Sequence, residues 1–286
     1  MKADAVQRQR PVSLSLLPAQ SIRRPGSFGR IRANEFYDSD HGRPRRMRRK
    51  PDHLTNISDE AAGRPGALLQ GTDGAWWDEF FTDRSRAIPF FAERPDENLA
   101  EWFASGLLAL GRVLEFGCGN GRNATYLASL GCAVDAVDFS AQAISWAKER
   151  AARAGATVTF QCCSIFDAQF AAGSYDFVYD CGCFHHLPPH RRQDYVRLVA
   201  RALRPGGSYG LVCFRPEGGS GYTDEQVYER GTLGGGLGYT EHSLRALWET
   251  PPFSVRVLRQ MNNAGTNEPY FGLDFLWVML ATRRDV

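Results

Sequence analysis

The sequence predicts an α/β protein with a doubly wound, mostly parallel sheet. From residue 112 onward, short apolar runs alternate with segments whose apolar positions repeat at helical spacing. Strands that are joined by helices run parallel, because the helix returns the chain to the same end of the sheet. The last two strand candidates, 253–260 and 271–282, have no helix between them. We expect them to form an antiparallel hairpin at one edge, which completes seven strands.

Local signals define the other elements. The remaining expected strands are 112–116, 133–137, 157–162, 175–180 and 208–214. The expected helices are 74–81, 99–110, 122–130, 140–154 and 188–203. Ser140 stands where a hydroxyl caps the first turn of its helix. The tetrapeptide Arg-Pro-Gly-Gly at 204–207 predicts a turn before the last parallel strand.

The first functional motif lies at residues 113–121, which read Val-Leu-Glu-Phe-Gly-Cys-Gly-Asn-Gly. Glycine is required where φ is positive or where the backbone comes very close to a ligand. The helix behind the loop offers unpaired N–H groups and the positive end of its dipole. The spacing of Gly117, Gly119 and Gly121 differs from the G-x-G-x-x-G pattern of dinucleotide sites. Glu115, just before them, disfavours a pyrophosphate and suits a cationic amino acid.

A second acid completes this pattern. Asp138 follows the apolar run 133–137, nineteen residues after Gly119. An acid at the end of the second strand of such a unit binds the hydroxyls of a ribose. A ribose together with an ammonium-bearing, phosphate-free tail describes S-adenosylmethionine. The alternative, three glycines in a flexible loop, does not account for Asp138.

These residues resemble the class I S-adenosylmethionine-dependent methyltransferases. The family's first motif, E/D-x-G-x-G-x-G, is matched in full by Glu115, Gly117, Gly119 and Gly121, and its second-strand acid by Asp138. The resemblance covers residues 105–285. It implies a Rossmann-like fold, S-adenosylmethionine as cofactor, and an enzyme that transfers a methyl group and releases S-adenosylhomocysteine.

The resemblance also implies further contacts with the cofactor. They are expected from Cys118, Phe139, Ser164, Ile165, Asp180 and Cys181. Cys118 belongs to the loop near the methionine part, Phe139 lies beside the adenine, and Asp180 is expected near the methionine end. The family often has an acid after the third strand that receives the adenine amino group. Ser164 stands there in this chain, so the adenine contacts depart from the common pattern.

Two adjacent histidines, His185 and His186, follow the fourth strand. In the resembled family, the loop after this strand faces the transferable methyl group. Imidazole titrates near neutral pH, so either residue is a candidate general base. The alternative is that they only pack or cap at this place. A soft nucleophile such as sulfur needs no base.

Two segments outside the alternating core are expected to border the site. Residues 71–104 begin with aromatic side chains at helical spacing, among them Trp76, Trp77 and Phe80. They resemble the N-terminal cover of thiopurine and related thiol methyltransferases; the alternative is that they only cover the sheet. Residues 215–238 form a Gly-rich insertion at the carboxyl end of the sheet, where α/β folds bind ligands. We expect a substrate-side lid there, and a plain connection is the alternative.

Charge divides the chain into two parts. The net charge of the 286 residues is +2, yet the first 50 residues hold 13 Lys and Arg against four acids. Residues 1–70 are rich in Arg, Pro, Gly and Ser without a sustained period, which predicts a disordered basic tail. Residues 71–286 are the predicted methyltransferase domain. Because this part is acidic, we expect a small-molecule acceptor and no nucleic acid.

Compartment is inferred from composition. No apolar run approaches the roughly 20 residues that span a bilayer, so no membrane partner is expected. The seven cysteines are an odd number in strand-like settings, which indicates reduced thiols in the cytoplasm. Their spacing is not typical of zinc, so no metal is expected. Two alternatives stay open: an RNA or protein methyltransferase that uses the basic tail, and a non-catalytic S-adenosylmethionine-binding protein.

Overall fold

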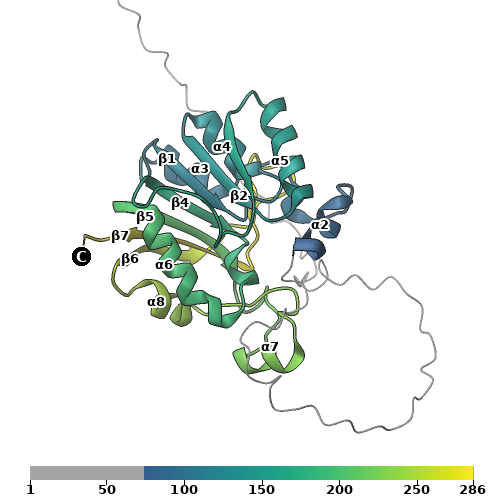
Figure 1. Cartoon of the computed structure of the whole chain (residues 1–286), viewed down its shortest axis with the longest axis vertical. Helices are drawn as coiled ribbons and strands as arrows, with labels where there is room; N and C mark the ends of the chain where they lie inside the picture. The colour runs from purple at the N-terminus through teal and green to yellow at the C-terminus, as the bar shows by residue number, and fades with distance from the viewer. Residues whose placement is uncertain (1–73, 286) are drawn as a thin grey trace, which may run out of the picture. The chain divides into compact units, whose positions relative to one another are not determined.

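A seven-stranded sheet forms the centre of the described part of the chain, residues 74–285 of a computed structural model (Figure 1). The strands lie in the order β3-β2-β1-β4-β5-β7-β6. The chain therefore starts near the middle of the sheet and winds outward in both directions, which confirms the predicted doubly wound α/β fold. The predicted basic tail, 1–70, lies outside the described residues.

The five strands on the β3 side of the sheet run parallel. They are β1 (Arg112–Phe116), β2 (Ala133–Asp138), β3 (Val158–Cys162), β4 (Tyr175–Cys181) and β5 (Leu203–Phe214). β5 begins earlier than the sequence predicts. Its register with β4 jumps from the pair Tyr175–Leu203 to the pair Phe177–Ser208. The expected turn at 204–207 is therefore an irregularity inside the strand.

The last two strands are β6 (Phe253–Gln260) and β7 (Leu276–Arg283). β7 pairs antiparallel with both β5 and β6, and β6 lies at the edge, so the predicted hairpin is confirmed. β7 starts later than expected because Phe271 pairs with Asp96 instead. The N–H of Phe271 donates to the oxygen of Pro95 at 2.8 Å, and its oxygen accepts from the N–H of Glu97 at 2.9 Å.

Helices cover both faces of the sheet (Figure 1). One face carries α3 (Glu97–Ala104), α4 (Arg122–Leu130) and α5 (Ala141–Arg153), and the other carries α6 (Arg192–Ala202) and α8 (Glu241–Trp248). The remaining elements are α2 (Gly74–Thr82), the 3-10 turns η2 (Pro89–Phe91), η3 (Phe184–His186) and η4 (Pro189–Arg191), and α7 (Asp224–Arg230). Within residues 74–285, every helix is too short or too polar to cross a membrane.

Capping residues and prolines explain where several of the helices begin. The Ser140 hydroxyl accepts from the N–H of Ala143 at 3.1 Å, which confirms the predicted cap of α5. α6 begins at Arg192 and not at 188, because the preceding prolines form the separate turn η4. The helices α7 and α8 were not predicted. Each begins with a capping box, at Thr223 and Thr240 respectively, so the sequence does carry a signal for them.

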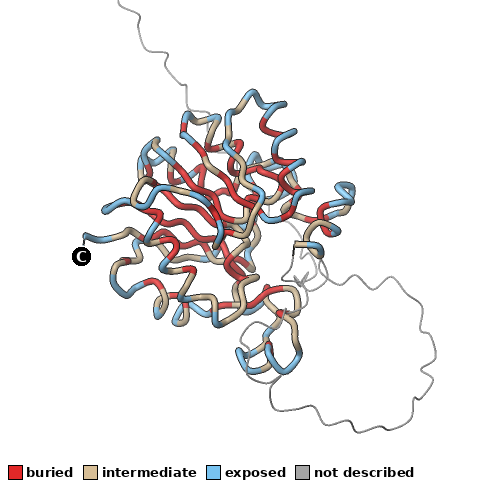
Figure 2. Tube along the Cα trace, in the orientation of Figure 1, coloured by how far each residue is buried: buried red, intermediate tan, exposed pale blue. Residues whose placement is uncertain are grey.

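Buried side chains follow the strands between the two helical layers (Figure 2). Along β1, Val113 packs on the face of α3 and α4, whereas Leu114 and Phe116 pack on the face of α6. The largest buried side chains of the two faces are Trp102 of α3 and Trp248 of α8. This two-sided core holds the carboxyl ends of the parallel strands at one edge, where α/β sheets bind ligands.

Candidate active site

The loop between β1 and α4 turns through three glycines whose φ angles lie between +51° and +74°. A Cβ atom on Gly117 would lie 2.5 Å from the Cβ of Cys183, and one on Gly121 would lie 2.6 Å from the Cβ of Ala147. These two glycines therefore allow neighbouring segments to pack closely against the loop. Gly119 lies between them and lines a cavity.

Asp138 joins this loop to the end of β2. Its Oδ2 accepts from the N–H of Gly119 at 2.8 Å, and its Oδ1 accepts from the N–H of Ser140 at 2.9 Å. Burial raises the pKa of Asp138 to about 6. A carboxylate has about four lone-pair sites, so Asp138 retains the capacity to accept hydroxyl groups from the cavity.

Glu115 contributes a carboxylate to the same cavity. Burial raises the pKa of Glu115 well above its usual value, and the nearby positive charge of Arg122 opposes this shift. Among the described residues, its Oε2 atom is enclosed and has no hydrogen-bond partner. A buried carboxylate oxygen without a partner is costly. A cation bound in the cavity would stabilise the charged form of this carboxyl.

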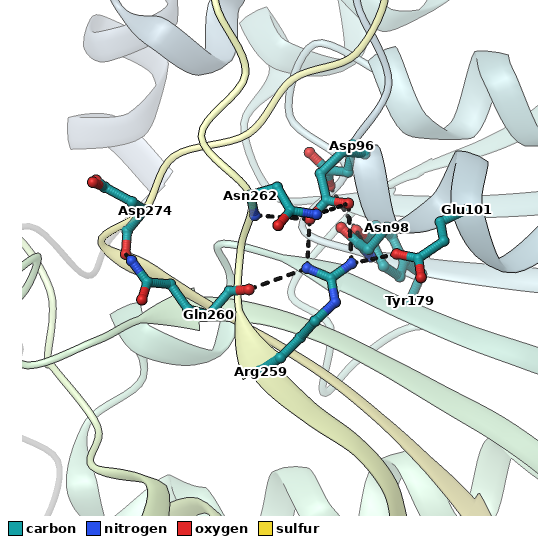
Figure 3. Close-up of polar contacts among 9 residues, drawn as sticks. Asp96, Asn98, Glu101, Tyr179, Arg259, Gln260, Asn262 and Asp274 are labelled. Carbon is teal, nitrogen blue, oxygen red and sulfur yellow. Dashed lines mark hydrogen bonds and ion pairs between the residues drawn. The ribbon is translucent and has the colours of Figure 1, made fainter. Parts of the chain in front are cut away.

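Arg122, the first residue of α4, places a second charge beside the cavity. Its side chain is 5% exposed, and its Nη2 lies 2.6 Å from Oδ1 of Asp96. Asp96 also accepts from the hydroxyl of Tyr179 at 2.6 Å (Figure 3). The guanidinium lies 4.3 Å from the centre of the Phe271 ring. Sequence reasoning missed Arg122, although a cation at a helix N-terminus opposes the dipole and so points to another role.

The cavity has a volume of about 400 Å³ and two chemically different walls. This volume lies within the range typical of small-molecule sites. The wall from the ends of β1, β2 and β3, here called the glycine wall, contains Glu115, Gly117, Cys118, Gly119, Asn120, Asp138, Phe139, Ser164, Ile165 and Phe166. Six residues of the opposite side are here called the aromatic wall: His185, Phe214, Phe271, Leu273, Phe275 and Leu276. The loop after β4 adds His186, His190 and Arg191 to the lining as a polar group outside this wall.

The glycine wall thus brings together the predicted cofactor residues of the first three strands, except Gly121, which packs behind it. Cys181 also lines the cavity, with its sulfur 3.3 Å from Nη2 of Arg122. The hydroxyl of Ser164 accepts from the N–H of Phe166 at 3.3 Å and so orders the turn after β3.

The predicted cofactor residue Asp180 lies outside the described cavity lining. Its Oδ2 accepts from the hydroxyl of Tyr195 at 2.5 Å, and its Oδ1 accepts from the N–H groups of Cys183 and Phe184 at 2.9 and 3.3 Å. Burial raises the pKa of Asp180 to about 7. The carboxyl is fully buried and is not part of the described cavity lining. It therefore holds the start of the loop that carries the histidines.

The two predicted histidines both line the cavity. The ring of His185 stacks on Phe214 with centroids 3.7 Å apart, and its Nδ1 accepts from the N–H of Phe214 at 3.2 Å. Burial lowers the pKa of His185 well below 6.5 and that of His186 to about 3. His186 contacts Trp77 edge-on at 4.8 Å. Both imidazoles are therefore neutral at physiological pH.

The two bordering segments differ in their relation to the cavity. In the aromatic segment, Trp77 of α2 lines the cavity, whereas Trp76 and Phe80 pack beside it. No described lining residue comes from 215–238. That segment packs instead behind the loop of η3 and η4, and the N–H of Leu237 donates to the oxygen of His185 at 2.8 Å.

Polar contacts join β6 and the connection 261–275 to α3 (Figure 3). Arg259 of β6 reaches across to α3 and donates from Nη1 to Oε1 of Glu97 at 2.7 Å. The amide of Gln260 donates to the backbone oxygen of Asp274 at 2.7 Å. Together these contacts fix the connection 261–275, which supplies much of the aromatic wall, against α3.

Comparison with known proteins gives the same family. A family model described as a methyltransferase domain matches residues 113–207. An uncharacterized methyltransferase of Schizosaccharomyces pombe is 33% identical over 131 residues, which cover 44% of this chain and 90% of that protein. The 2-heptyl-1-hydroxyquinolin-4(1H)-one methyltransferase of Mycobacteroides abscessus is 35% identical over 105 residues. That alignment covers 36% of this chain and less than half, 46%, of the relative.

Among solved structures, the fold is similar to that of the 1,6-didemethyltoxoflavin-N1-methyltransferase of Burkholderia thailandensis, which was crystallised with S-adenosylhomocysteine. The TM-score is 0.53 at 21% identity, and the match covers 82% of this chain and 94% of that one. Three features of the site fit the cofactor of such enzymes. Glu115 suits its ammonium group, the glycine loop suits its methionine part, and Asp138 suits its ribose. The chain therefore belongs to the class I S-adenosylmethionine-dependent methyltransferases, with S-adenosylmethionine as its cofactor.

Proposed function

We propose that this protein transfers the methyl group of S-adenosylmethionine to a small-molecule acceptor and releases S-adenosylhomocysteine. The observation that carries the proposal is the combination, in one cavity, of the unpartnered Glu115 oxygen with an aromatic wall. The first feature favours a cation, because a nearby positive charge would stabilise the buried carboxylate of Glu115, and the second offers no charged partner for one. The two walls thus suit ligands of different chemistry.

The glycine wall suits the cofactor residue by residue. We assign the methionine ammonium to Glu115 and the methionine carboxylate to Arg122, a buried cation of the same lining whose charge acts on Glu115. We assign the ribose hydroxyls to Asp138. The adenine is expected between Phe139 and the turn that begins at Ser164, because both line the same end of the glycine wall.

When bound, S-adenosylmethionine supplies an electrophilic methyl group: an acceptor lone pair forms the new bond to carbon as the carbon–sulfur bond breaks and its electrons pass to the sulfonium sulfur. The protein contributes alignment and exclusion of water. Trp77 and Phe81 of α2 close one side of the cavity, and Phe214 and Phe275 close another. These apolar surfaces favour a dry site.

The relatives support a small acceptor. One relative is named for a quinolinone, and a protein of similar fold was crystallised with 1,6-didemethyltoxoflavin. The enclosed volume of about 400 Å³ also suits small ligands better than a strand of nucleic acid. We further place the enzyme in the cytoplasm, because its seven cysteines are all free thiols.

Calorimetric titration of the full chain with S-adenosylhomocysteine tests the proposal, with NADH as the control ligand. Gly119→Val should abolish binding, because a branched side chain at φ +51° strains the loop and enters the cofactor space. Gly155→Val is the matched control. Gly155 has φ +63° on an exposed turn with open space around it, so the same strain arises far from the cavity.

The variant Gly155→Val should bind S-adenosylhomocysteine as the wild type does. Binding of NADH alone, or equal binding by Gly119→Val and the wild type, would contradict the proposed function.

A further inference from the structure

The aromatic wall has a composition that the cofactor does not explain. Its described residues are apolar or aromatic apart from one imidazole. The acidic residues of the described lining, Glu115 and Asp138, both belong to the opposite wall. Phe214 and Phe275 lie 6.2 Å apart at a tilt of 49°, and Phe271 is held under Arg122. A ligand here meets ring faces and edges and no carboxylate.

His185 is the polar group of this wall, and its hydrogen bonds fix its tautomer. Because Nδ1 accepts from the N–H of Phe214, the proton of the neutral ring is on Nε2. Among the described residues, Nε2 has no hydrogen-bond partner. It is also not fully enclosed by protein. It is therefore reachable from the cavity, where it presents one N–H donor.

The ring is also held in place from behind. The Phe214 ring covers one face at 3.7 Å, and a Cβ atom on Gly236 would come within 3.1 Å of Cδ2 of His185. The backbone oxygen of His185 accepts from Leu237 at 2.8 Å. A donor with this little freedom loses little entropy when it binds a ligand, which makes it suited to selecting one.

This arrangement is unsuited to proton removal. A general base must offer a free lone pair, but the Nδ1 lone pair of His185 accepts from Phe214 and Nε2 carries the ring proton, so neither nitrogen offers one. His185 therefore cannot take up a proton from the acceptor at Nε2, and this suits an acceptor whose nucleophilic atom carries no proton.

Resting on the proposed function, we propose that the acceptor is a flat heteroaromatic compound whose oxygen or nitrogen accepts the Nε2–H of His185 and whose methylated atom is free of a proton. Such a ring stacks against the aromatic wall. A polyamine would lose its hydration without finding a carboxylate on this wall. In the transfer, the acceptor's lone pair forms the bond to the methyl carbon and no proton moves to His185.

Acceptor binding is measured on the full chain saturated with S-adenosylhomocysteine. 4-Hydroxyquinoline is the flat probe, and cyclohexanone is a saturated probe that also accepts a hydrogen bond. Dithiothreitol represents aliphatic thiols. Turnover of each nucleophilic probe with S-adenosylmethionine is measured as the release of S-adenosylhomocysteine. We expect the flat probe to bind more tightly than the saturated one by roughly tenfold or more.

Two substitutions separate a donor from a base. His185→Phe keeps the stacked ring and removes the donor, so the dissociation constant of the flat probe should rise roughly tenfold while that of S-adenosylhomocysteine stays unchanged. His185→Gln places an amide N–H near the position of Nε2 and should restore most of the affinity. His242→Gln, on the exposed side of α8, is the matched control.

The results that would overturn this inference are distinct from a failure of the proposed function. Equal binding of the flat and saturated probes, or turnover of dithiothreitol alone, would refute a flat acceptor. If His185→Gln were as impaired as His185→Phe and both lost a pH dependence of kcat/KM that the wild type shows, His185 would be a base. Absence of S-adenosylhomocysteine binding would instead contradict the proposed function itself.

Discussion

Asp138 connects two loops and faces the cavity, so its removal should lower the affinity for the ligand. Asp138→Ala is expected to weaken binding of S-adenosylhomocysteine by roughly 1–3 kcal/mol, the cost of a lost charged hydrogen-bond partner. Asp167→Ala is the control, because Asp167 is an exposed acid at the same edge that does not line the cavity. Calorimetry gives both values. Unchanged affinity in Asp138→Ala would place the ribose elsewhere.

The carboxyl of Asp180 makes stability depend on pH. Its pKa rises from 3.8 to about 7 on folding because it is buried, so the folded state binds more protons than the unfolded state between these values. The free energy of unfolding should therefore fall as the pH rises from about 4 to 7. Asp180→Asn should flatten this part of the profile in denaturant titrations. A profile as steep as that of the wild type would show that Asp180 is charged in the native protein.

At the scale of elements, the segment 215–238 supports the histidine loop from outside. Asp224 of α7 receives a bidentate pair of hydrogen bonds from Arg192, at 2.7 and 2.9 Å, and the hydroxyl of Tyr228 lies 2.8 Å from Nδ1 of His190. The lid expected from the Gly-rich sequence stays a prediction, since the described contacts are those of a support.

Asp224→Ala distinguishes a support from a lid. Asp224 is about half exposed, so losing its ion pair should lower the free energy of unfolding by only about 0.5–1 kcal/mol. The affinity for S-adenosylhomocysteine should stay unchanged. Glu217→Ala, whose longer 3.6 Å pair with Arg215 is more exposed, is the control. A loss of cofactor affinity of tenfold or more in Asp224→Ala would indicate that the segment closes over the cavity.

Several elements were predictable because their signals are local. The alternation of apolar runs, the Ser140 cap and the glycine loop define the parallel strands and their helices. The sequence could not predict that Phe271 lies outside β7, because its pairing with Asp96 joins segments far apart in the sequence. The helices α7 and α8 carry capping boxes, which a search restricted to apolar periodicity overlooks.

At the scale of the whole molecule, the order of the strands explains the two walls. The sheet reverses its winding between β1 and β4, so the ends of β1, β2 and β3 meet those of β4 and β5 at one edge. The antiparallel hairpin then carries the connection 261–275 back to α3, where the N–H of Asn262 donates to Glu97 and Arg259 pairs with the same carboxylate (Figure 3). The proposed cofactor and acceptor surfaces thus come from different halves of one sheet.

The same division decides how much of the site the sequence reveals. Glu115 and Asp138 belong to a motif of fixed spacing, so they were predicted as cofactor residues. The aromatic wall combines the ends of β4 and β5 with the connection before β7, and no spacing links these segments. Asp180 follows the pattern of a strand-end acid, yet its carboxyl turns under η3 toward Tyr195. Side-chain direction at a strand end depends on packing that the sequence pattern does not contain.

A crystal structure of the full chain with S-adenosylhomocysteine would test the central claim most directly. We predict that the ligand's ammonium group lies within hydrogen-bond distance of Oε2 of Glu115 and its ribose hydroxyls on Asp138, with the aromatic wall still open to an acceptor. A ligand whose ribose or ammonium group contacts neither carboxylate, or whose adenine occupies the aromatic wall, would contradict the assignment of the two walls.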